Sequence, residues 1–203
     1  MWYFNGEIIK TPKTMVMAGI THPKAIFRDG DMLTSLGIKP YREVTPDSRY
    51  YNNGAFTVDE SGDEVVGTYA GTARDVDTLK SNMLDTINVQ VASRQGEIDW
   101  YWARADKGHT AVPSAISTYA TTIYTEQATK EGEVAALSTL DAIIEYENRP
   151  YTEVRKVSVY DDDGNFVEYS GTESFARHIN MCKHWTANPT DEVDPAFVSL
   201  TAD

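Results

Sequence analysis

The chain has 203 residues, of which 41% are hydrophobic and 11% aromatic, with a single cysteine. This profile is that of a globular protein and excludes a disordered, collagen-like or disulfide-dense chain. No apolar run approaches the length of about 18 residues that a membrane span needs, and the first residues lack the regions of a secretory signal. Cys182 has no partner for an internal disulfide, as expected of synthesis in the cytosol.

The charge balance is acidic, with 18 basic and 31 acidic residues and a formal net charge of −13. Nucleic-acid binding relies on clustered Lys and Arg that neutralise phosphates, whereas the basic residues of this chain are scattered. We therefore expect neither nucleic acid nor an anionic membrane as a partner. The acidic excess is expected to keep the protein soluble or to steer it toward a basic partner.

The first zone, residues 1–71, predicts a small β-rich module. Asn5 and Gly6 suit the positive φ angles of a type I′ turn and predict a hairpin at the N-terminus. Further elements are expected at residues 14–18 (a strand stopped by Gly19), 31–36 (a helical turn ended by Gly37), and 50–51, 55–58 and 64–69 (strands, the first two bracketing a turn at 52–54).

The second zone, residues 72–147, predicts an antiparallel helical hairpin followed by a short third helix. Apolar residues recur at three- and four-residue steps along one face of the first helix, namely Val76, Leu79, Met83, Ile87 and Val91. Thr72 with Asp75 resembles a capping box, and Gly96 is expected to interrupt the helix near its end.

The second helix of this zone is expected to begin at Pro113, because proline suits a first helical position. Its inner face is predicted to carry Ile116, Tyr119, Ala120 and Ile123. Ser138 with Asp141 repeats the capping pattern before the short third helix.

The third zone, residues 148–203, returns to β-structure. Residues 154–160 and 166–169 predict a hairpin with a long acidic tip. Thr172 is expected to cap a last short helix that carries Phe175, Ile179 and Cys182, and an extended tail follows. The fold class predicted from the three zones is α+β.

Two groups of residues invite a metal-site interpretation. His178 and Cys182 at i, i+4 would share a helix face near His184, but a zinc site needs four ligands, or three with an open position. The three aspartates of residues 161–165 are consecutive and flanked by strands, which favours a hairpin turn over a calcium loop. We expect no metal, no cofactor and no catalytic residue, and Cys182 has no evident base partner.

Aromatic and apolar residues near the ends of the predicted elements are candidate partner contacts. Aromatic side chains often lie in a core, but they are also the commonest hot-spot residues of protein interfaces. The six residues chosen on this ground are Trp2, Phe4, Trp100, Trp102, Phe197 and Leu200. We expect the small β-module and the tail to use them against a neighbouring chain.

Residues 98–104, IDWYWAR, and 111–119, AVPSAISTY, resemble a pattern of tail-fibre assembly and tail-fibre-associated proteins of tailed bacteriophages. Those proteins carry an Asp-Trp pair, a proline about a dozen residues later and a helix with Tyr-Arg; here Ala120 stands in place of that arginine. Residues 19–23 and 36–40 are similar to small phage tail modules. The resemblance extends loosely over residues 14–146.

The resemblance implies a structural, non-enzymatic component of a phage virion, at a fibre, nozzle or baseplate of the tail. Its partners would be other tail proteins, such as fibre, tail-tube or baseplate subunits, in a symmetric multi-copy assembly. It would be made in the host cytoplasm and end in the virion tail. One alternative is a chaperone that assists fibre assembly and then leaves, and a more distant one is a metal-dependent hydrolase.

Overall fold

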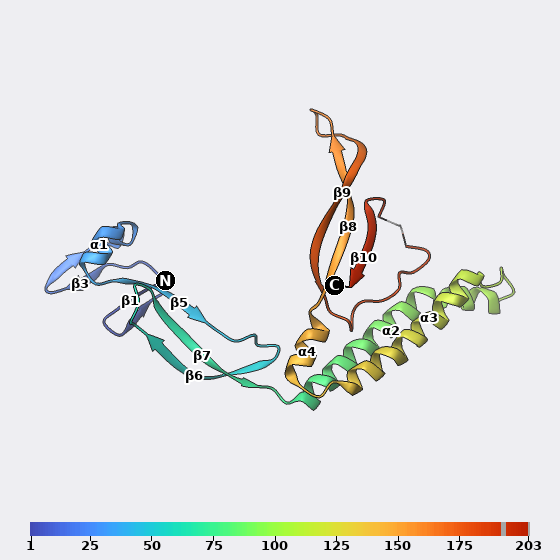
Figure 1. The fold of residues 1–203 in the computed structure, drawn as a ribbon, viewed down its shortest axis with the longest axis horizontal. Coiled ribbons are helices and arrows are strands. Elements are labelled where there is room, and N and C mark those ends of the chain that lie inside the picture. The colour runs from blue at the N-terminus through green and yellow to red at the C-terminus, as the bar shows by residue number, and fades with distance from the viewer. Residues whose placement is uncertain (192–193, 203) are drawn as a thin grey trace. The chain divides into compact units, whose positions relative to one another are not determined.

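The computed structural model describes residues 1–191 and 194–202, and its fold class is α+β, as predicted (Figure 1). The chain divides into two compact units, Met1–Arg74 and Asp75–Asp203. The second unit contains both the helices and the C-terminal strands, which the sequence analysis had placed in separate modules, 72–147 and 148–203. Residues 192, 193 and 203 of the expected tail lie outside the described residues.

The N-terminal unit begins with the predicted hairpin, in which β1 (Trp2–Phe4) pairs antiparallel with β2 (Glu7–Ile9). Asn5 and Gly6 have φ angles of 50° and 83°, so the type I′ turn is confirmed. The turn is specified locally, because these residue types tolerate positive φ and match the twist of the flanking strands.

The next elements of this unit are β3 (Met15–Met17), β4 (Ile20–His22), the 3-10 helix η1 (Lys24–Arg28) and α1 (Gly30–Ser35). Gly19 does end the expected strand, but it does so within a turn to β4, which the sequence analysis did not anticipate. Asp29 caps α1 by accepting a hydrogen bond from the Met32 backbone N–H, and Gly37 at φ 72° ends it as expected.

The main sheet of the N-terminal unit has the order β2-β1-β5-β7-β6, with β5 (Lys39–Val44), β6 (Tyr51–Asp59) and β7 (Val65–Ala73). Strands β5 and β7 are parallel, and the other pairs are antiparallel. The turn expected at residues 52–54 is wrong. Strand β6 runs through it with an irregularity in register between Asn53 and Phe56, so the extra residue is absorbed without reversing the chain.

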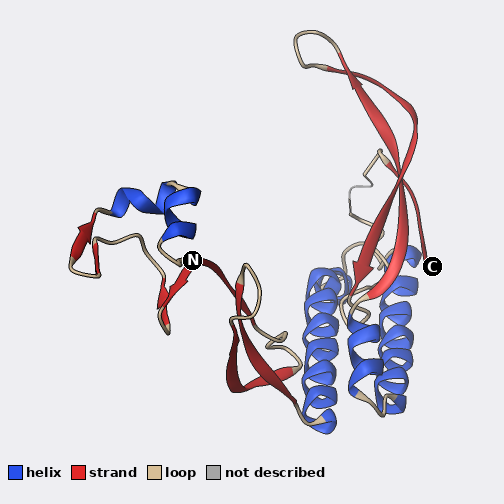
Figure 2. Cartoon of the chain, turned by 60° about the vertical axis from the view of Figure 1, so that its left-hand side comes forward, coloured by secondary structure: helices blue, strands red, loops and turns tan. Residues whose placement is uncertain are grey.

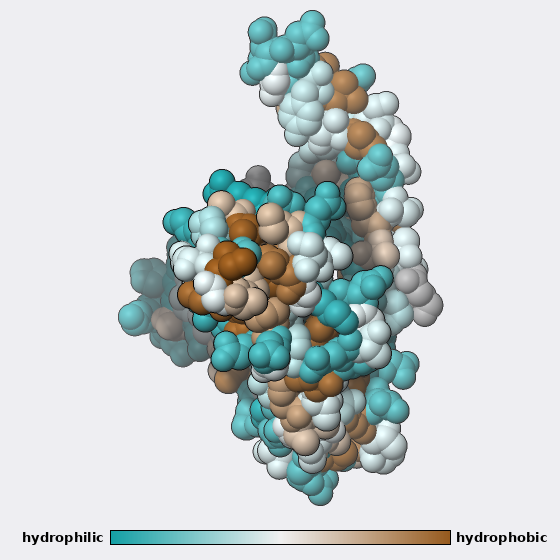
Figure 3. Space-filling view, turned by 90° about the vertical axis from the view of Figure 1, so that its left-hand side faces the viewer, coloured by the Kyte–Doolittle hydropathy of each residue, from teal (hydrophilic) through white to brown (hydrophobic). Residues whose placement is uncertain are grey.

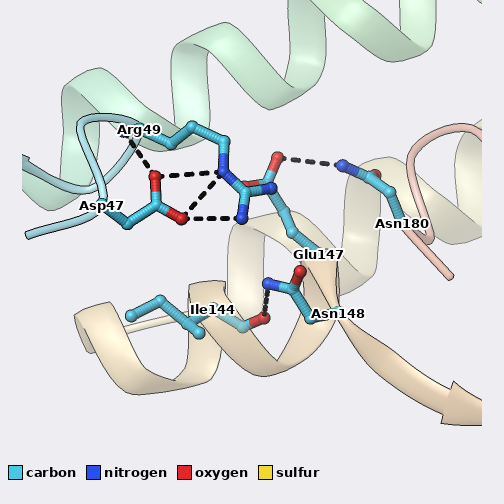
Figure 4. A network of polar contacts seen from close by, with 6 residues as sticks. All are labelled: Asp47, Arg49, Ile144, Glu147, Asn148 and Asn180. Atoms are coloured by element: carbon cyan, nitrogen blue, oxygen red, sulfur yellow. Dashed lines mark hydrogen bonds and ion pairs between the residues drawn. The ribbon is translucent and has the colours of Figure 1, made fainter. Parts of the chain in front are cut away.

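Two small apolar clusters hold this unit together. One contains Ile9, Met17, Ile26, Phe27 and Ile38, and the other contains Tyr3, Tyr41 and Val65. After β5 the chain turns at Asp47, whose carboxylate accepts hydrogen bonds from the backbone and guanidinium of Arg49 (Figure 4). These bonds lower the pKa of Asp47.

The C-terminal unit begins with α2 (Val76–Asp106), whose buried residues are Leu79, Met83, Ile87, Val91 and Ile98. The predicted apolar face is therefore correct. Asp75, rather than Thr72, caps the helix by accepting from the Thr78 N–H at 2.8 Å, and Thr72 belongs to β7. The expected break at Gly96 is wrong, because α2 continues to Asp106.

Helix α3 (Ser114–Ala136) packs antiparallel along α2, and its buried residues include the predicted Ile116, Tyr119 and Ile123 (Figure 2). Pro113 precedes the helix by one residue. The short α4 (Leu140–Glu147) is capped by Thr139 rather than Ser138.

Polar side chains tie the end of α4 to the segments that follow it. Asn148 donates to the Ile144 carbonyl at 2.7 Å, and Glu147 accepts from Asn180 at 3.2 Å (Figure 4).

A three-stranded antiparallel sheet completes this unit in the order β10-β8-β9. The predicted hairpin is confirmed and is longer than expected, with β8 (Arg149–Tyr160) and β9 (Phe166–Ile179). The predicted last helix, capped by Thr172, is wrong because those residues continue β9. The expected extended tail contains β10 (Phe197–Ala202), which pairs with β8 of its own chain.

None of the described helices combines the length and the apolar character that a membrane crossing requires.

Candidate functional site

The distal part of the β8–β9 hairpin, residues 157–170, projects from the sheet and is called the arm here (Figure 2). Strand β10 pairs with β8 only up to Arg155, so in the described chain the arm consists of two strands. Most of its side chains are exposed on both faces. A two-stranded ribbon of this kind has little stability of its own in water, and it gains stability when a partner covers it.

The arm tip is a turn that Asp161 organises. Its carboxylate accepts hydrogen bonds from the backbone N–H groups of Asp163 and Asn165, which hold the pKa of Asp161 below its ordinary value. Gly164 supplies a φ of 83° that closes the turn. Asp162 and Asp163 are exposed beside it, so the tip presents a concentrated negative charge to solvent.

Aromatic rings flank this acidic turn on both strands. Tyr160 and Phe166 are 59% and 51% exposed, and their ring centroids lie 6.2 Å apart in an edge-to-face arrangement. Phe166 also meets Tyr169 at 4.8 Å, and the Lys156 ammonium lies 5.4 Å from the Tyr169 ring. The arm therefore combines exposed aromatic surface with negative charge, a composition typical of an interaction element.

A network of charges holds the base of the arm. The buried Glu153 of β8 pairs with Arg155 of the same strand and with Arg177 of β9, and Arg155 reaches Asp194 at 2.8 Å. The hydrogen bonds from Arg155 and Arg177 lower the pKa of Glu153. The network joins β8, β9 and the segment before β10, which fixes the direction in which the arm leaves the sheet.

Residues 181–188, called the strap here, connect the sheet to α2 and α3. Trp185 is buried, donates from its indole to the Cys182 carbonyl at 3.0 Å, and lies beneath the cations of Arg94 and Lys130. The Arg94 guanidinium donates to the Thr186 carbonyl at 3.3 Å. Cation–π contacts of this kind contribute most where the cation is withdrawn from water.

A pocket of about 440 Å³ opens between α3 and the strap. Lys130, only 6% exposed, donates to the Met181 carbonyl at 2.9 Å, and burial lowers the pKa of its amine. Glu126 accepts hydrogen bonds from Thr186, and Glu133 accepts from Tyr146 at 2.8 Å. Because these groups form hydrogen bonds within the chain, the contacts around the pocket hold the strap against α3.

The residues weighed as zinc ligands do not form a helix face. His178 is exposed on β9, Cys182 is buried in the strap, and half-buried His184 lies against the Tyr151 ring at 5.7 Å. Burial raises the pKa of the Cys182 thiol to about 11 and lowers that of His184. Within the part of the chain that the structure describes, no three metal-ligating side chains come together.

Another pocket, of about 490 Å³, lies in the N-terminal unit and is called the basic aromatic pocket here. Its lining residues are Trp2, Pro12, Lys24, Ala25, Phe27 and Arg28. The rings of Trp2 and Phe27 meet edge to face at 4.8 Å and form its apolar wall. The lining includes two cations and no carboxylate, and residues 1–28 contain four basic residues and one acidic residue before Asp29 and Asp31 follow, in a chain with a net charge of −13. This pocket is therefore a basic region of an acidic protein.

The N-terminal unit also exposes apolar side chains on its α1 and β3–β4 region. Figure 3 shows hydrophobic residues gathered there, and Val16, Ile20 and Met32 are exposed in these elements. Exposed apolar residues that gather on one face indicate a surface that a partner covers.

The six residues chosen from the sequence as partner contacts lie in three elements, two each in β1, α2 and β10. Trp2 lines the basic aromatic pocket, and Phe4 is half-buried against the larger apolar cluster. Trp100 is exposed on α2 and stacks on Tyr101 at 3.7 Å.

The other three predicted residues, like Trp100, lie within the C-terminal unit. Trp102 is half-buried on α2, while Phe197 is exposed and Leu200 half-buried on β10. The structure thus brings none of these three to the arm.

Four residues of these surfaces are not among the contacts predicted from the sequence: Tyr160 and Phe166 of the arm and the cations Lys24 and Arg28 of the pocket. The sequence does contain a signal for the aromatic pair, because Tyr160 and Phe166 flank an acidic turn. A hairpin tip that only faces solvent would have polar residues at these two positions. The basic region was hidden by the net charge of the whole chain, and a count by segment reveals it.

Comparison of the chain with models of protein families, with curated proteins and with solved structures finds no match.

Proposed function

We propose that this chain is a structural subunit of a bacteriophage tail, mounted at a fibre, nozzle or baseplate and acting through protein–protein contacts. The observation that supports a contact role is the arm, with its exposed aromatic rings and acidic tip on a two-stranded ribbon. The assignment to a phage tail rests on the sequence resemblance of residues 98–119.

The way the arm is held favours a structural subunit. The Glu153 network fixes its base, and the strap fastens the same sheet to α2 and α3 through Trp185 and Lys130. Because the base of the arm is already ordered, binding of the arm costs less conformational entropy than binding of a free segment, which favours a durable contact.

The test is mass spectrometry of purified particles from cells infected with the phage that encodes this chain. A subunit is expected in mature virions at a fixed ratio to other tail proteins. If the chain is abundant in the infected lysate and absent from virions, the assembly-chaperone alternative replaces the proposal.

A matched pair of variants tests whether the arm makes the contact. In one variant, residues 157–171, which are the arm and the unpaired Gly171, are replaced by a two-residue Asn-Gly turn that joins the paired residues Lys156 and Thr172. We expect it to fold and to be lost from particles. The control is Tyr124→Ala, which removes an exposed aromatic ring from α3 and should leave incorporation unchanged. Normal incorporation of the armless variant would contradict a role for the arm.

A further inference from the structure

The basic aromatic pocket and the arm tip have opposite chemistry. Trp2 and Phe27 give the pocket an apolar wall, and Lys24 and Arg28 are exposed among its lining residues. Its volume of about 490 Å³ falls within the range of about 300–1,000 Å³ typical of pockets that hold a ligand-sized group. An occupant that suits it has an aromatic anchor flanked by carboxylates.

The arm tip has that composition. Residues 157–170 contain four acidic residues and no basic residue. Phe166 is half-exposed at the point where the turn ends, and the carboxylates of Asp162 and Asp163 are exposed within the turn. An aromatic ring in a pocket, with charge pairs around it, is the usual arrangement of an interface hot spot.

We propose that the arm tip of one copy docks into the basic aromatic pocket of a second copy. Phe166 enters between the apolar wall and the cations, while Asp162 and Asp163 face Lys24 and Arg28. The proposal rests on the proposed function only in treating the arm as a contact element, and it names the partner as this same chain.

Charge complementarity selects a second copy as the occupant. Residues 157–170 have four acidic and no basic residues, whereas the lining of the pocket has two basic and no acidic residues, so the tip and the pocket attract each other although both units have a net negative charge. The arm and the basic aromatic pocket are different surfaces of each copy, so the contact is head to tail. Such heterologous contacts close into rings when the rotation between subunits allows it, as in a symmetric tail assembly.

Sedimentation velocity of the purified full-length chain over a wide concentration range tests the proposal. We expect self-association at low ionic strength that weakens as added salt shortens the Debye length from about 30 Å to about 3 Å. Two variants reverse the charges, Lys24→Glu with Arg28→Glu in the pocket and Asp162→Lys with Asp163→Lys in the tip. Each alone should associate at least about tenfold more weakly than the wild type.

An equimolar mixture of the two variants is the decisive measurement. The unchanged acidic tip of the first fits the unchanged basic pocket of the second, and the reversed tip fits the reversed pocket. The mixture should therefore regain association close to that of the wild type. The four substituted side chains are exposed, and circular dichroism checks that both variants fold.

A second pair of variants tests the aromatic anchor. Phe166→Ala should weaken association about tenfold or more, whereas Val167→Ala, an exposed neighbour that points to the opposite face of the ribbon, should have little effect.

Three outcomes would overturn the proposal: a wild type that is monomeric at every concentration, association that neither charge reversal weakens, or a mixture that stays dissociated. A monomeric chain that still enters virions would remove self-docking and leave the subunit role standing. A chain that self-associates as expected but is absent from virions would support self-docking and remove the subunit role.

Discussion

The N-terminal unit builds its sheets from strands of three to nine residues and divides its apolar interior between two small clusters. The C-terminal unit is built on helices of 31 and 23 residues, to which a strap and a charge network fasten a long hairpin. The two units therefore meet two different structural requirements. The first unit forms a pocket from side chains of short segments, whereas the second holds an exposed arm in a fixed direction.

The surfaces differ in the same way. Nearly all of the acidic excess belongs to the C-terminal unit, with 22 acidic against 10 basic residues, whereas the N-terminal unit is almost neutral. The formal charge of −13 therefore describes one unit rather than the whole protein, and it hides the basic residues around the pocket of the other.

The strongest way to test this comparison is to open a cavity in each unit in turn. Ile123→Ala removes a fully buried side chain of α3 and should destabilise the C-terminal unit by about 2–5 kcal/mol. Ile38→Ala in the larger N-terminal cluster should act at the lower end of that range, because a small cluster collapses more readily around the cavity.

Hydrogen exchange followed by mass spectrometry, in increasing denaturant, measures both units at once. Each substitution should lower protection in its own unit and leave the other unchanged. Simultaneous loss of protection in both units would mean that they unfold as one.

A smaller loss is expected from Gly67→Ala in β7. An added Cβ would lie 2.2 Å from the Tyr41 hydroxyl oxygen and 2.6 Å from the Phe56 ring, so the buried Tyr41 would have to move. Overpacking of this kind costs about 1–3 kcal/mol. The free energy of unfolding of the N-terminal unit, measured by denaturant unfolding, should fall, whereas the control Gly62→Ala, in the turn between β6 and β7, should change it by about 0.5 kcal/mol or less.

Elements specified by neighbouring residues could be predicted from the sequence. The turn at Asn5–Gly6 follows from the φ preferences of two residues, and the buried face of α2 follows from the helical period. The cap of α4 was misplaced by one residue, at Ser138 instead of Thr139, because both side chains can accept the capping hydrogen bond.

Elements that depend on distant pairing could not be predicted in this way. Residues 172–179 have apolar spacing that suits a helix, but they pair with the residues of β8 and form a strand. The tail was expected to lie along a neighbour because nothing local assigns a partner to Phe197, and β8 supplies that partner within the chain. For the same reason the arm, which depends on where β10 stops, was not foreseen as a site.

The buried thiol of Cys182 gives a prediction on pH that applies to the C-terminal unit alone. Burial raises its pKa from the ordinary 9.0 to about 11, so the unfolded chain releases this proton at lower pH than the folded chain. The protonated Cys182 thiol therefore contributes to the free energy of unfolding below about pH 9. This contribution is lost as pH rises toward 11, and the loss is about 1 kcal/mol near pH 10.

Denaturant unfolding at several pH values measures this, with Cys182→Ala as the comparison. The stability difference between the wild type and this variant should shrink between about pH 9 and 11. Parallel pH profiles of the two proteins would contradict the shifted pKa.

The smallest expected effect is a gain in the C-terminal unit. Gly96 lies within α2, and a Cβ added there meets nothing within 4 Å, so Gly96→Ala should stabilise this unit by about 0.5–1 kcal/mol. Gly132→Ala in α3, which is equally open, is the matched variant. If Gly67→Ala lowers the free energy of unfolding and Gly96→Ala raises it, the N-terminal unit needs its glycine for close packing. The C-terminal unit then tolerates a glycine that its 31-residue helix does not need. If Gly96→Ala stabilised the purified chain but lowered its incorporation into virions, the face of α2 around Gly96 would be a surface that the assembled particle covers.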